Sequence, residues 1–205
     1  MRVKSIIILC LLSTFVLCVG TQASSSDTNK SLNSSDGAKE TFSALADLPV
    51  SEQTRNVTII INDYSTDQDL QRLQNILTDS GPDALLKTLG KMKSLGRIER
   101  VGTVSFYDFR IIISKPTAEG RQIYAVADRP MKFWEEYYDT QSTEYPFGVM
   151  ELNLKKGKDG KEEGTGSLVY AAKIKGLTGD KFKLENYTFA PIQLLGVRQL
   201  GSSRH

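Results

Sequence analysis

Phe109-Arg-Ile-Ile-Ile-Ser114 and Arg121-Gln-Ile-Tyr-Ala-Val-Ala127, joined by Lys115-Pro-Thr-Ala-Glu-Gly120, form the stretch of sequence that decides the fold class. Both outer runs are rich in β-branched and aromatic residues, which favour strands. The segment between them carries Pro116 and Gly120, which are typical of turns. Two such runs around a short loop predict a β-hairpin, and therefore an antiparallel pair of strands.

The same pattern recurs on both sides of this hairpin. Runs of β-branched and aromatic residues alternate with turn signals that contain Gly, Pro or Asp. The further strands expected are 57–61, 98–106, 148–154, 166–175, 182–188 and 192–200. Seven to eight strands with short links predict an antiparallel, strongly curved sheet, which is either barrel-like or folded into two layers.

Helical signals lie between the first of these strands and the others. Thr66 is a typical N-cap residue, and acidic residues follow it where the helix dipole favours negative charge. Ser80-Gly81-Pro82 is expected to end one helix and begin a second, which runs to about Leu95-Gly96. The apolar positions with helical spacing are Leu70, Leu73, Ile76 and Leu77, then Leu85, Leu89 and Met92. The sequence thus predicts an α+β domain with a helical hairpin after its first strand.

Residues 1–23 have the pattern of a secretory signal peptide. Arg2 and Lys4 precede a largely apolar run from Ile6 to Gly20, and Thr21-Gln-Ala23 then offers a small residue at the cleavage site, with a tolerable one two positions before it. The run is shorter than the roughly 20 residues that a membrane span needs. We therefore expect cleavage, no stable membrane span afterwards, and an exported protein that is periplasmic or extracellular.

The segment 24–55 is dominated by Ser, Asp, Asn, Thr and Lys, so it is predicted to be a flexible polar tether. One exception within it is 39–48, where Phe42, Leu45 and Leu48 are spaced for a short docking helix. A single folded domain is expected over 56–200, followed by a tail at 201–205.

Charge and residue content exclude several function classes. Two of the 26 basic side chains lie in the predicted signal peptide, and the remaining 24 equal the 24 acidic ones. The rest of the chain therefore has a formal net charge of zero, which gives no support for a nucleic-acid partner. Both cysteines, Cys10 and Cys18, lie in the leader, and the single histidine is His205. A nucleophilic triad and a zinc site of Cys and His ligands are therefore excluded, and no catalytic residue, metal ligand or cofactor is predicted.

Aromatic and acidic residues concentrate in 128–147. This segment holds the only Trp, three of the eight Tyr and five carboxylates, a composition that suits a binding surface. The candidate ligand-binding residues are Asp128, Arg129, Trp134, Glu135, Tyr137, Tyr138 and Tyr145. The alternative, which we favour for the rings, is that Phe133, Trp134 and Tyr137 plug one end of the core from a helical turn.

The carboxylates of this segment also suggest a hydrolase. A pair of carboxylates can serve as the acid and the base of a glycosidase without any histidine. The residues available for such a pair are Asp128, Glu135, Glu136, Asp139 and Glu144. Their spacing does not select a pair, since adjacent Glu135 and Glu136 point in different directions on a helix or strand.

Several short blocks resemble a family of exported bacterial proteins, chiefly acidobacterial. The blocks are Asp128-Arg-Pro130 with Phe133-Trp-Glu135, Tyr145-Pro-Phe147 with Glu151-Leu152, and Leu184-Glu-Asn-Tyr187 with Pro191 to Arg198. The resemblance covers about residues 56–198 and implies a bacterial envelope setting. It implies no catalytic residue, cofactor or substrate.

From the sequence we predict an exported, non-catalytic binding or interaction module of the bacterial cell envelope, with an unknown envelope ligand or protein as its partner. The signal peptide, the tether and the aromatic segment are the basis of this prediction. A carboxylate-based glycan hydrolase is one alternative. A structural interaction protein that pairs through a sheet edge is the other.

Overall fold

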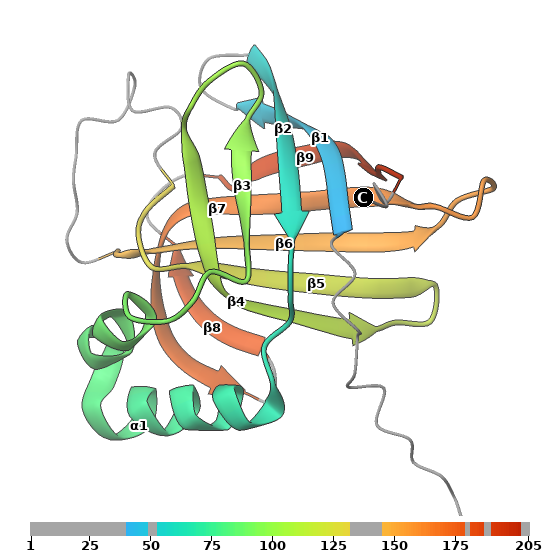
Figure 1. Cartoon of the computed structure of the whole chain (residues 1–205). Coiled ribbons are helices and arrows are strands. Elements are labelled where there is room, and N and C mark those ends of the chain that lie inside the picture. Colours follow the sequence, from blue (N-terminus) through green and yellow to red (C-terminus); the bar gives the residue numbers. More distant parts are fainter. Residues whose placement is uncertain (1–39, 49–52, 132–144, 179–180, 187–189, 202–205) are drawn as a thin grey trace, which may run out of the picture. The chain divides into compact units, whose positions relative to one another are not determined.

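The computed structural model describes residues 40–48, 53–131, 145–178, 181–186 and 190–201. All of them belong to one compact unit that spans residues 33–205. The elements are β1 (Glu40–Leu48), β2 (Gln53–Ile61), α1 (Asp67–Leu89), β3 (Gly96–Arg100), β4 (Phe106–Pro116), β5 (Gly120–Ala127), β6 (Phe147–Lys156), β7 (Glu162–Thr178), β8 (Lys181–Asn186) and β9 (Ile192–Gln199). Figure 1 shows strands that wrap around a common axis, with α1 outside them.

Eight of the strands close into a barrel. Their order is β6-β5-β4-β3-β2-β1-β9-β7, and a further pairing of β6 with β7 completes the ring. Every pair is antiparallel. The ninth strand, β8, is not part of the ring. It pairs with the C-terminal part of β7, residues 172–178. The predicted antiparallel, barrel-like sheet is confirmed.

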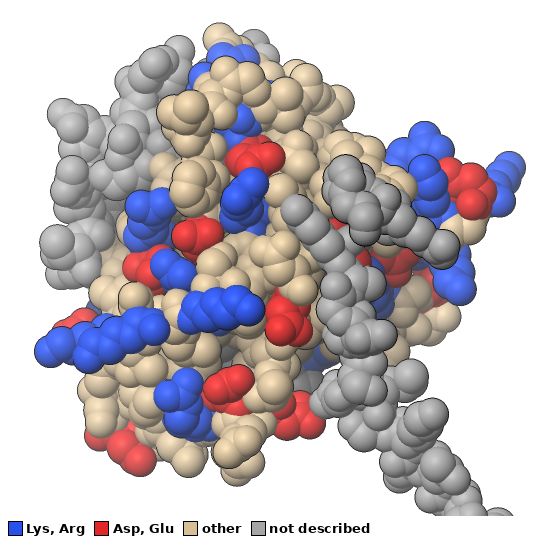
Figure 2. All heavy atoms as spheres, in the orientation of Figure 1, with Lys and Arg blue, Asp and Glu red and all other residues tan. Residues whose placement is uncertain are grey.

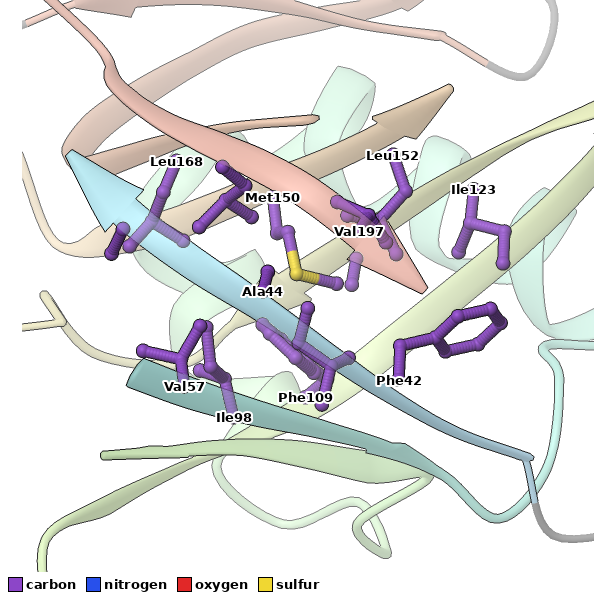
Figure 3. Packing of buried hydrophobic residues seen from close by; sticks show 14 of the residues in the cluster. Phe42, Ala44, Val57, Ile98, Phe109, Ile123, Met150, Leu152, Leu168 and Val197 are labelled. Atoms are coloured by element: carbon purple, nitrogen blue, oxygen red, sulfur yellow. The ribbon is translucent and has the colours of Figure 1, made fainter. Parts of the chain in front are cut away.

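The barrel interior is apolar. Alternate residues of each strand point inward, and their side chains form one apolar cluster, part of which Figure 3 shows, with Phe42, Phe109 and Met150 among its large members. Within the described residues, no polar or charged side chain is buried. An eight-stranded barrel is just wide enough for side chains to fill it, and this interior is therefore a packed core.

A second apolar cluster lies outside the barrel, beneath α1. Residues of β4, β5, β6 and β7 that point outward pack against the helix, which contributes Leu73, Leu77, Leu85 and Leu89. This cluster accounts for the burial of both faces of β5 from Ile123 to Ala127. The helix and the β7–β8 ribbon thus cover one side of the barrel.

The helix begins as its sequence predicts and breaks where Gly81 predicts. The Thr66 side chain accepts a hydrogen bond from the Asp69 backbone N–H at 3.1 Å. Gly81 has φ of 82° and ψ of −179°, outside the helical region, and Pro82 starts the following turns. No helical hairpin forms, however. After the break only Pro82–Leu89 remains helical, and the chain leaves the helix at Gly90 rather than near Leu95.

The predictions for 24–55 are wrong over residues 40–48 and 53–55, which form β1 and the start of β2. The three-residue spacing of Phe42, Leu45 and Leu48 suggested a helix, but burial follows a two-residue period: Phe42, Ala44, Ala46 and Leu48 are buried, whereas Leu45 is 42% exposed. Alanine fits the crowded barrel interior, so a strand with few large residues completes the ring. The domain therefore begins before residue 56. Residues 24–39 and 1–23 lie outside the described residues.

The strand predicted at 98–106 is interrupted. β3 ends at Arg100, a turn occupies residues 101–105, and β4 begins at Phe106. Gly102 has a φ of 82°, which a residue with a side chain rarely adopts, and it permits the turn. The remaining strands lie where they were predicted, with ends that differ by up to four residues.

Candidate functional site

Three of the seven predicted ligand-binding residues lie in the described part of the chain: Asp128, Arg129 and Tyr145. Trp134, Glu135, Tyr137 and Tyr138 lie outside it, as do Phe133 and the carboxylates Glu136, Asp139 and Glu144. The structure therefore tests neither the proposed core plug nor the proposed carboxylate pair of this segment.

Asp128 has a structural partner. Its Oδ2 accepts a hydrogen bond from Arg110 Nε at 3.1 Å, and both side chains are mostly buried, at 15% and 18% exposure. The same guanidinium donates to the Met92 carbonyl at 3.1 Å. Asp128 thus helps to fasten the segment after α1 to the barrel, through Arg110.

Tyr145 belongs to a different network. Its hydroxyl donates to Glu185 Oε1 at 3.2 Å, and Glu185 also pairs with Lys175. The hydrogen bond from Lys175 lowers the pKa of the Glu185 carboxyl below its ordinary value. These contacts link the start of β6 to the β7–β8 ribbon, and none of them involves Asp128 or Arg129.

Arg129 is exposed and lies against the hairpin formed by β3 and β4. Its guanidinium carbon is 5.1 Å from the centre of the Tyr107 ring, within the range of a cation–π contact. Its Nη2 donates to the Phe106 carbonyl at 3.1 Å. Of the three predicted residues that the structure describes, Arg129 is therefore the one whose charged group is presented at the surface beside aromatic residues.

The hairpin itself presents apolar side chains to solvent. Val104 is 96% exposed, Val101 57% and Phe106 44%. A second arginine, Arg97, lies over the Phe106 ring with its guanidinium carbon 5.6 Å from the ring centre. We call Arg97, Val101, Val104, Phe106 and Arg129 the hairpin surface. Figure 2 shows neutral side chains together with basic ones at the top of the molecule, where the β3–β4 turn lies, and basic and acidic ones interspersed below.

Sequence reasoning missed this surface because Val101, Val104 and Phe106 are typical strand residues. They fall within the strand predicted at 98–106. The signal that pointed to a turn was Gly102, and a glycine within a run of β-formers is also compatible with a bulge. Only the pairing of Glu99 with Phe106 shows that the chain reverses between them.

The other end of the barrel, where β1, β5 and β7 begin, carries a charged network. Arg121 Nη2 donates to Glu40 at 2.6 Å, and Arg121 Nε donates to Glu162 at 2.8 Å. Arg121 Nη1 donates to the Tyr64 hydroxyl at 2.8 Å, which in turn donates to Glu40 at 3.1 Å. We call these four residues the Arg121 network. They close this end of the barrel over its apolar core.

The electrostatics of the network favour its charged and hydrogen-bonded state. Desolvation opposes the charge of Arg121, but hydrogen bonds with Glu162 and Glu40 outweigh it and raise the pKa of the guanidinium above its ordinary value. Burial raises the pKa of the Tyr64 phenol well above its ordinary value of 10.0, with the nearby charges of Arg121 and Glu40 acting in opposite directions. One guanidinium therefore holds two carboxylates and a neutral phenol.

Replacing Tyr64 by phenylalanine should lower the free energy of unfolding by about 1 to 2 kcal/mol at neutral pH, because two part-buried hydrogen bonds lose their partner. Above pH 10.0 the unfolded chain ionises this phenol while the folded protein does not, so its stabilising contribution falls as pH rises. The difference in stability between the two proteins should thus shrink in alkaline solution. Urea unfolding of both at neutral pH and above pH 10 tests this, and a difference that grows with pH would contradict it.

Among the residues that the structure describes, no three or more His, Cys, Asp or Glu side chains are grouped to hold a metal ion. Within the same residues, no helix combines the length and apolar character that crossing a membrane requires. Comparison with known proteins found no family model, no curated protein and no solved structure that matches this chain.

Proposed function

We propose that this chain is an exported, non-catalytic binding module of the bacterial envelope, and that it binds its partner through the hairpin surface. Export is supported by the leader pattern of residues 1–23, and the envelope setting by the resemblance stated above. The binding role rests on one observation. Val104 is 96% exposed on a hairpin whose neighbours Val101 and Phe106 are also exposed.

This exposure marks the hairpin as a contact surface. Single exposed apolar residues are common, but here three of them lie within six positions of one hairpin. The six large hydrophobic side chains that are exposed in the described residues include all three of them; the others, Leu45, Leu195 and Leu200, lie on β1, on β9 and just after β9. Leu45 and Leu195 are paired across β1 and β9, but the three hairpin side chains are the most exposed of the six.

The barrel interior offers no comparable place for a ligand. A binding site inside a barrel combines an apolar lining with a few polar groups that orient the ligand. Here the interior side chains are apolar and pack against one another. Binding at the outer surface is thus the better-supported mode.

The hydrolase alternative receives less support from the described residues. Two pairs of carboxylates each share an arginine: Glu40 and Glu162 are ion-paired with Arg121, and Asp108 and Asp128 with Arg110. A glycosidase needs one carboxyl group that is protonated and another that is free to attack or to activate water. Glu40 and Glu162 both accept hydrogen bonds from the same arginine, an arrangement that suits a structural network.

Pairing through a sheet edge is the second alternative. β8 pairs with β7 alone, so its other edge is free of strand partners within the described residues. Its sequence, Lys181-Phe-Lys-Leu-Glu-Asn186, carries two lysines, and charged residues on an edge strand discourage pairing with another chain. This composition favours the hairpin surface over the β8 edge as the binding region.

Photocrosslinking in the native host tests the proposal. A photoreactive amino acid at position 104 should give a discrete adduct, with a protein or with a lipid, because this side chain is presented to the partner. The matched control is position 158, in the exposed loop between β6 and β7, where no adduct is expected. Equal adducts at both positions, or none at position 104, would contradict the assignment of the hairpin surface.

A further inference from the structure

We propose that the partner of the hairpin surface is an anionic phospholipid bilayer, onto which the β3–β4 turn docks by inserting Val101 and Val104. This inference rests on the proposed function, and it specifies the chemistry of the partner. It is carried by three features of the hairpin: its protruding shape, its internally bonded turn and its flanking arginines.

The shape of the apolar surface fits a membrane better than a protein. Val104 lies at the tip of a turn and is almost wholly exposed, so the surface protrudes. A stable protein interface buries about 800 Å² on each partner, far more than three side chains at a tip provide. Insertion into the boundary between headgroups and acyl chains needs only apolar groups that reach about 5 to 10 Å deep.

Several backbone polar groups of the turn have hydrogen-bond partners within the protein. The Val101 N–H donates to the Asn56 carbonyl at 3.0 Å, and the Thr103 N–H donates to the Arg100 carbonyl at 3.3 Å. The Thr103 hydroxyl donates to that same carbonyl at 3.1 Å and accepts from the Ser105 N–H at 3.3 Å. Because polar backbone groups are costly to bury without partners, these bonds favour shallow insertion of the turn.

The arginines of the surface are placed behind the apolar tip. Arg97 lies over Phe106, the first residue of β4 after the turn, and Arg129 lies over Tyr107, the second. When Val104 is inserted, both guanidinium groups are close to the level of the headgroups. Arginine binds phosphate with several hydrogen bonds, and basic residues near an anionic bilayer strengthen its attachment.

Two acidic residues on the hairpin limit this attraction. Glu99 accepts a hydrogen bond from Arg97 at 3.1 Å, and Asp108 accepts one from the Ser94 hydroxyl at 2.9 Å. Glu99 both neutralises Arg97 and lies next to the turn. Replacing Glu99 by glutamine should therefore strengthen binding to an anionic bilayer, whereas replacing Arg97 by glutamine should weaken it.

Sedimentation with phospholipid vesicles tests the inference. The purified protein should bind vesicles of equimolar phosphatidylglycerol and phosphatidylcholine, bind phosphatidylcholine alone weakly, and lose affinity as salt is added. Val104→Asp should reduce binding about tenfold or more, and Arg97→Gln and Arg129→Gln about fivefold each. Glu99→Gln should increase it about two- to fivefold. Leu195→Asp, on the exposed face of β9, is the matched control and should bind like the parent protein.

The outcomes separate this inference from the proposed function. Equal melting temperatures for Val104→Asp and the parent protein show that an altered affinity is not due to unfolding, as expected for a side chain 96% exposed. Absence of binding to anionic vesicles, or equal loss with Leu195→Asp, overturns the membrane as partner. If a protein adduct nevertheless forms at position 104 in the host, the proposed function stands with a protein partner. If no adduct forms either, both fail.

Discussion

Replacing Gly164 by alanine should lower the free energy of unfolding by about 4 kcal/mol or more. Gly164 lies on β7 opposite Leu154 of β6, in the pairing that closes the barrel. A Cβ atom at this position would lie 2.9 Å from the carbonyl carbon of Asn153 and closer still to its oxygen. The obstacle is backbone rather than the end of a flexible side chain, so the two strands must separate to admit a methyl group.

A second glycine on the same strand provides the control. A Cβ atom at Gly176 would meet no atom within 4 Å, so Gly176→Ala should change stability by no more than about 1 kcal/mol. Urea unfolding followed by circular dichroism measures both variants. A Gly164→Ala protein as stable as Gly176→Ala would show that the strands adjust freely, and that close approach of β6 and β7 is not needed for closure.

Replacing Arg121 by methionine should lower the free energy of unfolding by about 3 to 5 kcal/mol. Methionine keeps much of the side-chain volume, but it leaves Glu40 and Glu162 without the cation that pairs with both. The two carboxylates are 19% and 17% exposed, so water only partly replaces the lost guanidinium. Two uncompensated negative charges would then face each other at the end of the barrel.

The exposed pair of Arg198 with Asp159 serves as the comparison. These side chains are 62% and 43% exposed, and Arg198→Met should leave the unfolding midpoint nearly unchanged. In the Arg121→Met background, the further changes Glu40→Gln and Glu162→Gln should restore part of the lost stability, because they remove the unpaired charges. Failure to recover would contradict the explanation by unpaired charges, and an Arg121→Met midpoint equal to that of Arg198→Met would assign the network no role in stability.

Local signals predicted the parts of the fold that depend on neighbours in sequence. The hairpin of β4 and β5 forms around Pro116 and Gly120 as predicted, and Thr66 caps α1. Gly81 breaks the helix because its φ of 82° is incompatible with continuation. Each of these features is decided by a few consecutive residues and by the backbone conformations they permit.

The parts that were not predicted depend on tertiary context. β1 contributes two alanines, Ala44 and Ala46, to the interior cluster, so its sequence alone lacks the large alternating residues typical of a strand. The prediction of one strand over 98–106 is wrong for the opposite reason. Val101 and Val104 have strand propensity but lie at an exposed turn, and such a departure from the local rule is typical of functional positions.

The candidate sites show the same division. The sequence drew attention to 128–147 because unusual residues are adjacent there, and Arg129 does belong to the hairpin surface. The Arg121 network was not predicted because its members are distant in sequence. The hydrogen bond between Arg121 and Glu40, for example, joins residues that are 81 positions apart. No motif in one sequence reports a contact of that separation.

The pairing of β1 with β9 has a consequence for how the protein forms. Phe42 pairs with Gln199, so the ring closes only when the first and last strands of the domain meet. Contacts between residues so distant in sequence form slowly, since a long loop must first be ordered. Until β9 has been synthesised, a partial sheet ends in two open edges that invite pairing with other chains. A chaperone that keeps the chain unfolded until its synthesis is complete would prevent such pairing.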